Sequence, residues 1–223
     1  MITIRKSQDR GHAEHGWLDS YHSFSFADFY DPKWMGFRSL RVINEDRVAA
    51  AQGFGSHPHR DMEIITYVLS GQLKHKDSMG NEGLISPGEV QKMSAGSGIV
   101  HSEFNASSKE EVHLLQIWIT PDTKNLKPMY EQNLLPTDQQ NSLQPFPVSI
   151  HQDAKIFRGR LTKGHELTYK LDKERGAWLQ MIFGSLSINN LSLETGDAAG
   201  IEQEMNLKFI SSGQCEFLFF DLK

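Results

Sequence analysis

The sequence contains a single cysteine, Cys215, so no disulfide can form within the chain. This usage fits a reducing compartment. The sequence also lacks a run of about 18 apolar residues, the length that a membrane-spanning helix needs. Its first ten residues have neither the apolar centre nor the small-residue cleavage site of a secretion signal. We therefore expect a cytoplasmic protein that does not enter a membrane.

Positive charge is scarce as well. The chain has 23 Lys and Arg against 28 Asp and Glu, a formal net charge of -5. A protein that holds nucleic acid or an anionic membrane through a basic surface carries the opposite balance, so we expect no direct contact with either. With 38% hydrophobic and 23% charged residues, the composition is that of an ordinary globular protein. The 223 residues suffice for one large or two small domains.

No segment has the periodicity of an amphipathic helix of three turns, and short β-type segments recur instead. Ile64 to Leu69 is β-branched and aromatic, and Val112 to Thr120 is a stronger strand that Pro121 ends. Phe24 to Phe26 alternates as a strand does. Short strands with turns roughly every 8–12 residues are typical of a sandwich or barrel. We interpret the polar, proline-bearing stretch 121–150 as a connector.

The pattern of the first half recurs in the second. Tyr67 to Leu73 resembles Met181 to Leu186, and Val112 to Thr120 occupies the place that Glu216 to Leu222 occupies later. This order indicates two copies of one β-fold. The second copy has no pair of histidines with similar spacing, so we expect a single metal site, in the first copy.

Two clusters carry the candidate chemistry. His57 and His59 lie two residues apart in the first cluster, and His101 and Glu103 in the second. Residues i and i+2 of a strand point to the same face, so two such strands facing one another would bring four ligands together. Three imidazoles and one carboxylate suit Fe, Zn, Ni, Cu, Co or Mn better than Ca or Mg. Four protein ligands also leave coordination positions open, as in a catalytic site.

The remaining histidines have no partner at this spacing, and we interpret them as surface or packed residues. They are His12, His15, His22, His75, His113, His151 and His165. His113 alternates with Leu114 on its strand and is a weaker candidate for a place beside the site. The aromatic run 17–30 is expected to form core or pocket wall. Nothing near Cys215 marks it as a nucleophile.

Both clusters resemble the two motifs of the cupin family. The first motif matches the chain at His57, His59, Glu63 and Gly71. The second motif matches it at Gly88, Gly96, His101 and Asn105. The sequence departs from the general motifs at Ala51 and Ser94, where they have glycine and proline. These departures match one branch, the pirin family, and within it the bacterial pirin-like proteins with quercetin 2,3-dioxygenase activity. The resemblance covers nearly the whole chain.

The resemblance implies an all-β fold of two tandem cupin domains, each a double-stranded β-helix or jelly roll. We place the metal-binding domain at 1–130 and a cupin-like domain without metal ligands at 131–223. The pirin pattern assigns the ligands to His57, His59, His101 and Glu103. It leaves out Glu63, a ligand in many other cupins; the strand spacing alone permits Glu63 without requiring it.

The implied activity is a metal-dependent dioxygenase that opens the flavonol ring of quercetin with O2 and releases CO. We expect one divalent transition metal, with Fe(II) favoured over Zn, Ni, Cu, Co and Mn. Glu103 is the candidate catalytic residue, since it could accept the proton of the flavonol hydroxyl. Phe54, Met62 and Gln116 are candidate pocket residues.

Two other functions fit the same resemblance. Pirins are also implicated as regulators, so the chain could be a non-enzymatic protein whose metal acts as a switch in binding a protein partner. Another cupin reaction, such as isomerisation, is the second alternative. No strongly basic motif lies near the ligands, which disfavours phosphosugar substrates. An open hydrophobic pocket beside the metal ligands would favour an enzyme over a regulator.

Overall fold

The computed structural model describes residues 1–136 and 139–223, and over these ranges the expected all-β fold is confirmed. They contain 21 strands and a single short 3-10 helix, η1 (Ser7–Asp9), with no α-helix. None of the helical structure in this described part could cross a membrane. The chain divides into two compact units. We call Gly11–Leu135 with Pro147–Gln152 the N-terminal unit, and Met1–Arg10 with Pro136–Phe146 and Asp153–Lys223 the C-terminal unit.

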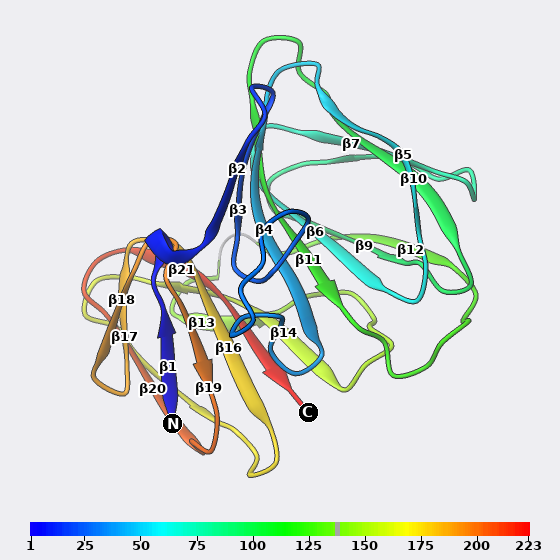
Figure 1. Ribbon diagram of the computed structural model, residues 1–223. Helices are drawn as coiled ribbons and strands as arrows, with labels where there is room; N and C mark the ends of the chain where they lie inside the picture. The colour runs from blue at the N-terminus through cyan, green and yellow to red at the C-terminus, as the bar shows by residue number, and fades with distance from the viewer. Residues whose placement is uncertain (137–138) are drawn as a thin grey trace. The chain divides into compact units, whose positions relative to one another are not determined.

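The N-terminal unit consists of two antiparallel sheets, drawn mostly in blue to green in Figure 1. The larger has the order β12-β9-β6-β11-β4-β3-β2 and the smaller β5-β10-β7-β8. Val48, Val68 and Leu114 of the larger sheet pack against Leu73 and Ile85 of the smaller. The bounds are β2 Gly11–Glu14, β3 Leu18–His22, β4 Leu40–Val48, β5 Gly53–His59, β6 Glu63–Ser70, β7 Leu73–Asp77, β8 Glu82–Ile85, β9 Glu89–Ser94, β10 Ile99–Asn105, β11 Val112–Ile119 and β12 Met129–Leu134.

The C-terminal unit also consists of two antiparallel sheets, with the orders β1-β19-β16-β21-β14-β13 and β15-β20-β17-β18. Its first strand comes from the start of the chain, where β1 pairs with β19 (Figure 1). In this ladder Ile2 lies opposite Ile201. The units therefore differ from the predicted division at 130/131, because β1 completes the sheet of the later half. The bounds are β1 Ile2–Arg5, β13 Ser142–Pro145, β14 Ala154–Leu161, β15 Glu166–Lys170, β16 Gly176–Phe183, β17 Ser185–Ile188, β18 Leu191–Glu194, β19 Ala198–Ile201, β20 Asn206–Ser211 and β21 Cys215–Leu222.

The two units repeat one strand order. In the larger sheets β9-β6-β11-β4 corresponds to β19-β16-β21-β14, and in the smaller sheets β5-β10-β7-β8 corresponds to β15-β20-β17-β18. The similarity between the two halves of the sequence thus corresponds to a repeat of strand topology. It agrees with the prediction of two copies of one β-fold.

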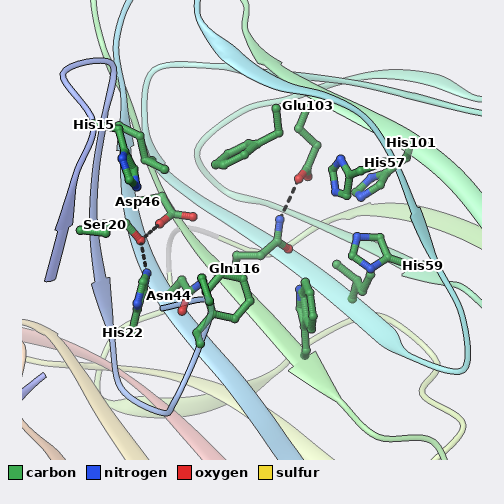
Figure 2. A pocket seen from close by; sticks show the side chains of 17 residues that line it. His15, Ser20, His22, Asn44, Asp46, His57, His59, His101, Glu103 and Gln116 are labelled. Atoms are coloured by element: carbon green, nitrogen blue, oxygen red, sulfur yellow. Dashed lines mark hydrogen bonds between the residues drawn. The ribbon is translucent and has the colours of Figure 1, made fainter. Parts of the chain in front are cut away.

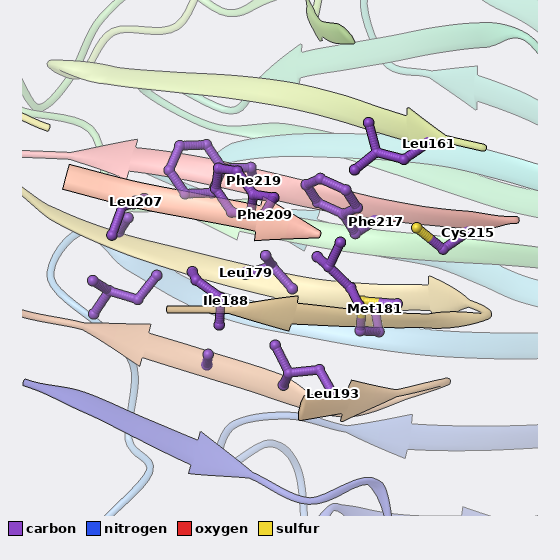
Figure 3. Close-up of a cluster of buried hydrophobic side chains, with 14 of the residues drawn as sticks. Leu161, Leu179, Met181, Ile188, Leu193, Leu207, Phe209, Cys215, Phe217 and Phe219 are labelled. Carbon is purple, nitrogen blue, oxygen red and sulfur yellow. The ribbon is translucent and has the colours of Figure 1, made fainter. Parts of the chain in front are cut away.

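The interior of the C-terminal unit is filled with apolar side chains (Figure 3). The ring of Phe209 lies 5.7 Å from that of Phe217 and 5.5 Å from that of Phe219, measured between centroids. A Cβ on Gly159 would lie 2.2 Å from the Phe217 ring, so this position has room only for glycine. Cys215 belongs to the same buried cluster, in agreement with its interpretation as an inert residue.

Two local predictions were wrong. The stretch 121–150 is more than a connector, because it contains β12 and β13. Each of these strands lies at the edge of its sheet, where β12 pairs with β9 and β13 pairs with β14. Edge strands tolerate polar residues and proline, so their sequences lack the apolar pattern by which a strand is recognised. Phe24 to Phe26 is not a strand; Phe26 makes an isolated bridge with Phe29 inside a loop.

We expect Phe219→Ala to lower the free energy of unfolding by about 3–5 kcal/mol, because it empties a position that is 0% exposed. Phe183→Ala is the matched control, since the same change at a side chain that is 41% exposed leaves no cavity. Urea unfolding followed by circular dichroism measures both. Equal losses in the two variants would contradict the assignment of Phe219 to the core.

Candidate metal centre

The two predicted clusters lie on neighbouring antiparallel strands. β5 pairs with β10 so that His57 lies directly opposite His101. His59 shares a face of β5 with His57, and Glu103 shares a face of β10 with His101. The register shifts between His101 and Glu103, which places Glu103 opposite Phe54. This shift is a local bulge, a common way to redirect side chains next to active sites.

The three imidazoles meet closely. One ring nitrogen from each of His57, His59 and His101 lies within 4.8 Å of those of the other two. The centroids of the rings are 4.4 Å apart for His57 and His101, and 4.9 Å apart for His59 and His101. Nδ1 of His57 lies 2.7 Å from the carbonyl oxygen of Gly55. Because that oxygen can only accept, Nδ1 carries the proton and Nε2 keeps its lone pair for a ligand.

Glu103 crosses the interior toward the larger sheet, where two donors hold its carboxylate. Thr66 Oγ1 on β6 donates to Oε1 over 3.2 Å. Gln116 Nε2 on β11 donates to Oε2 over 2.8 Å, as Figure 2 shows. Burial raises the pKa of Glu103 to about 7, and these two hydrogen bonds oppose the rise. A nearby cation would favour the ionised form of a carboxylate in this position.

The histidines suit a metal ion. Burial, aided by the neighbouring histidines, lowers the pKa of His101 to about 3, and burial with the influence of His57 lowers that of His59 to about 4. Both rings are therefore neutral at pH 7, the form that binds metal. Nε2 of His59 and both nitrogens of His101 are buried without a hydrogen-bond partner among the described residues. A metal ion would satisfy one nitrogen on each ring.

A fourth histidine lies beside the cluster and was missed. His75 on β7, which is completely buried, lies opposite Glu103 across the β7–β10 ladder. A group formed by His75, His101 and Glu103 also has its ligand atoms within 4.8 Å of one another. Nε2 of His75 lies 3.4 Å from a carboxylate oxygen of Asp77. His75 and Asp77 are two residues apart on one strand, so the spacing that identified the other pairs would have found this one.

Glu63 lies on the other face of its strand. Ile64 lines the pocket described below and Thr66 bonds to Glu103, so the even-numbered residues of β6 face the site. Glu63 instead accepts a hydrogen bond from Ser94 Oγ over 2.9 Å, and its carboxylate lies 3.7 Å from Nζ of the fully buried Lys92. Glu63 thus points away from the face of β6 that carries Ile64 and Thr66.

A pocket of about 180 Å³ opens over the cluster. Its lining includes His57, His59, His101 and Glu103, together with the predicted pocket residues Phe54 and Gln116. The prediction for Met62 was wrong. That side chain lies outside the lining and packs against a small cluster that contains Met93 and Ile99, because the chain turns at Asp61 before β6 begins.

A second polar group lines the same pocket from β3 and β4 (Figure 2). Ser20 lies opposite Asp46 and His22 lies opposite Asn44 in the ladder between these strands. Burial raises the pKa of Asp46 to about 7. The hydrogen bond from Ser20 opposes this rise, and the negative charge of Glu103 adds to it. The interpretation of His22 as an ordinary packed residue was therefore incomplete, as it was for His15, which also lines the pocket.

His113 does not reach the site. Its Nε2 lies 3.0 Å from Glu45 on the opposite face of the larger sheet from Asp46 and Gln116. Among the described residues, the pocket lining contains no lysine or arginine. Two buried carboxyl groups thus share a pocket without a basic side chain, an arrangement that favours a bound cation.

Comparison with known proteins gives consistent matches across the chain. Residues 3–119 match the pirin family, and residues 136–222 match the quercetinase C-terminal cupin domain. A protein of Escherichia coli (strain K12) named quercetin 2,3-dioxygenase is 46% identical over 228 residues, which cover 100% of this chain and 99% of the relative.

Solved structures agree. The crystal structure of YhhW from Escherichia coli superposes with a TM-score of 0.97 at 45% identity, covering 100% of this chain and 98% of that one. The structure of the bacterial pirin YhhW in complex with nickel(II) has a TM-score of 0.96 at 45% identity, with 100% and 99% covered. The chain therefore belongs to the pirin family, and its two repeated units are cupin domains.

Proposed function

We propose that this chain is a metal-dependent dioxygenase of the quercetinase type, which opens the flavonol ring of quercetin with O2 and releases CO. The observation that carries the proposal is the position of the three histidines and Glu103 in the lining of an open, partly aromatic pocket. A relative 46% identical over the full chain bears the name quercetin 2,3-dioxygenase, which supports the same activity here.

His57, His59, His101 and Glu103 would hold the metal. A divalent transition metal in this site supplies Lewis acidity, which lowers the pKa of a hydroxyl group bound to it. We favour Fe(II), and Ni, Zn, Cu, Co and Mn suit the same donors. The nickel(II) complex of the related YhhW supports a divalent transition metal in general.

The chain's own residues would orient the flavonol and accept its proton. Glu103 is the only carboxylate among the proposed ligands, and Thr66 and Gln116 hold both of its oxygens in place. We assign to Glu103 the proton of the flavonol 3-hydroxyl, since it is the carboxylate in the pocket lining that lies with the proposed ligand histidines. Phe54 and Trp118 provide aromatic surface for the substrate rings.

The pocket also favours an enzyme over a purely regulatory protein. A metal that acts only as a structural switch needs no cavity, whereas here about 180 Å³ lies beside the proposed ligands. The absence of lysine and arginine from the described lining disfavours phosphorylated substrates and favours a neutral phenolic compound.

Oxygen-electrode and CO measurements on the metal-loaded protein test this activity. With quercetin, we expect O2 uptake and CO release in equal amounts, both reduced to background in His101→Ala because that variant loses a metal ligand. His113→Ala is the matched control, since His113 pairs with Glu45 away from the pocket. Undiminished turnover by His101→Ala with an intact fold would refute the assignment.

The two buried glutamates should behave differently when each is changed to glutamine. Glu103→Gln removes a proposed ligand, so we expect metal affinity to fall by more than about tenfold. Glu63→Gln leaves the proposed ligand set intact and should keep the metal content. It should instead lower the free energy of unfolding by about 1–3 kcal/mol, because Lys92 loses the more deeply buried of its two carboxylate neighbours and keeps Glu131 at 3.3 Å.

Metal analysis of the purified variants and urea unfolding separate the two effects. Loss of metal from Glu63→Gln without loss from Glu103→Gln would reverse the proposed roles.

A further inference from the structure

The polar group on β3 and β4 forms an ordered chain of hydrogen bonds. Ser20 Oγ donates to Oδ1 of Asp46, and Nε2 of His22 lies 2.8 Å from the same hydroxyl oxygen. A serine hydroxyl has one proton, which the ionised Asp46 receives, so that His22 Nε2 donates to Ser20 when Asp46 is ionised. The chain therefore runs from His22 through Ser20 to Asp46 and ends on an acceptor.

Two acceptor atoms of this group remain for a ligand. Ser20 engages one carboxylate oxygen of Asp46, and Figure 2 shows that carboxylate directed into the pocket. Asn44, which is 4% exposed, also lines the pocket, and its Oδ1 is buried with no hydrogen-bond partner in the described part of the chain. Buried polar atoms without partners are rare and call for a ligand or water.

The surroundings define what such acceptors can bind. Phe26, Phe54 and Trp118 contribute aromatic surface to the same pocket, whose described lining has no basic side chain. A carboxylate or phosphate on the ligand would be repelled by Asp46, whereas a hydroxyl group can donate to it. The pocket volume of about 180 Å³ suits an aromatic ring, since an apolar cavity of about 150 Å³ accepts benzene.

We propose that Asp46 and Asn44, positioned by Ser20 and His22, form a subsite that binds a phenolic hydroxyl on a ring of the substrate remote from the reacting hydroxyl. This proposal rests on the proposed flavonol-cleaving function and adds a determinant of specificity to it. The subsite selects hydroxylated flavonols over unsubstituted ones, because only the former can donate a hydrogen bond to Asp46. The proposed ligand histidines take no part in that choice.

Binding without turnover tests the subsite. Titration calorimetry of the metal-loaded protein under anaerobic conditions would measure Kd for quercetin and for 3-hydroxyflavone, which lacks the other ring hydroxyls. At about pH 8, where Asp46 with its pKa of about 7 is mostly ionised, we expect the Kd of quercetin to rise about tenfold in Asp46→Asn. The reason is that a charge-assisted hydrogen bond becomes a neutral one. The Kd of 3-hydroxyflavone should change by less than about twofold.

Two further variants keep the test decisive. Asn44→Leu preserves the shape of the side chain and removes the unpartnered oxygen. We expect it also to raise the Kd of quercetin more than the Kd of 3-hydroxyflavone. Glu45→Gln is the matched control on the same strand, since Glu45 faces away from the pocket and pairs with His113. It should leave both Kd values unchanged.

The outcomes separate this proposal from the proposed function. The subsite is overturned if Asp46→Asn and Asn44→Leu weaken the binding of both ligands equally, or if they leave the Kd of quercetin unchanged. This holds even if the wild-type protein consumes O2. Selective loss of quercetin binding in a protein that consumes no O2 supports the subsite and refutes the dioxygenase. Failure of the wild-type protein to bind either compound overturns the subsite.

Discussion

The antiparallel pairing of β5 with β10 is the constraint on which the candidate site depends. It places His57 opposite His101 and lets two pairs of side chains, each two residues apart, converge. Gly53 allows the backbones of β5 and β10 to approach one another, because a Cβ at this position would lie 2.2 Å from the carbonyl oxygen of Glu103. Gly96 has a φ of +47° in the turn before β10, next to the backbone of Leu126, so a larger residue would be strained there. The glycines of the motifs thus serve strand approach and turn geometry.

The two cupin domains use the same strand order for opposite purposes. In the C-terminal unit, Phe209 of β20 belongs to the buried apolar cluster, and Leu167 of β15 packs against it. In the N-terminal unit the corresponding strands β10 and β5 carry the histidines and Glu103, and Thr66 and Gln116 reach them from the other sheet. Burying polar side chains stabilises a fold only when they are hydrogen-bonded or bind a ligand. The C-terminal unit therefore has an apolar, packed interior, whereas the interior of the N-terminal unit holds the pocket with the candidate metal ligands.

Sequence reasoning succeeded where the signal was local. A period of two along one segment identified β-branched strands such as Val112–Ile119. The same period predicted that His57 and His59, and His101 and Glu103, share a face, and all four side chains line one pocket. Sequence reasoning failed where the signal was a contact between distant segments. Ser20 meets Asp46, and His22 meets Asn44, only because β3 and β4 pair in that register. Within each strand, Ser20 and His22 are two residues apart, as are Asn44 and Asp46. Serine, asparagine and aspartate are nevertheless too common on exposed strands for that spacing to mark a site.

The carboxylate of the site illustrates the limit of a spacing rule. A period of two states which residues share a face of a strand, but neighbouring strands decide which face is interior. On β6 the interior face toward the site carries Ile64 and Thr66, so Glu63 turns toward Ser94 and Lys92 instead. On β10 the side chains facing the site are His101 and Glu103, and β7 supplies His75 beside them. The carboxylate that shares the pocket lining with the three histidines therefore comes from the strand of His101, although Glu63 is closer in sequence to the first pair of histidines.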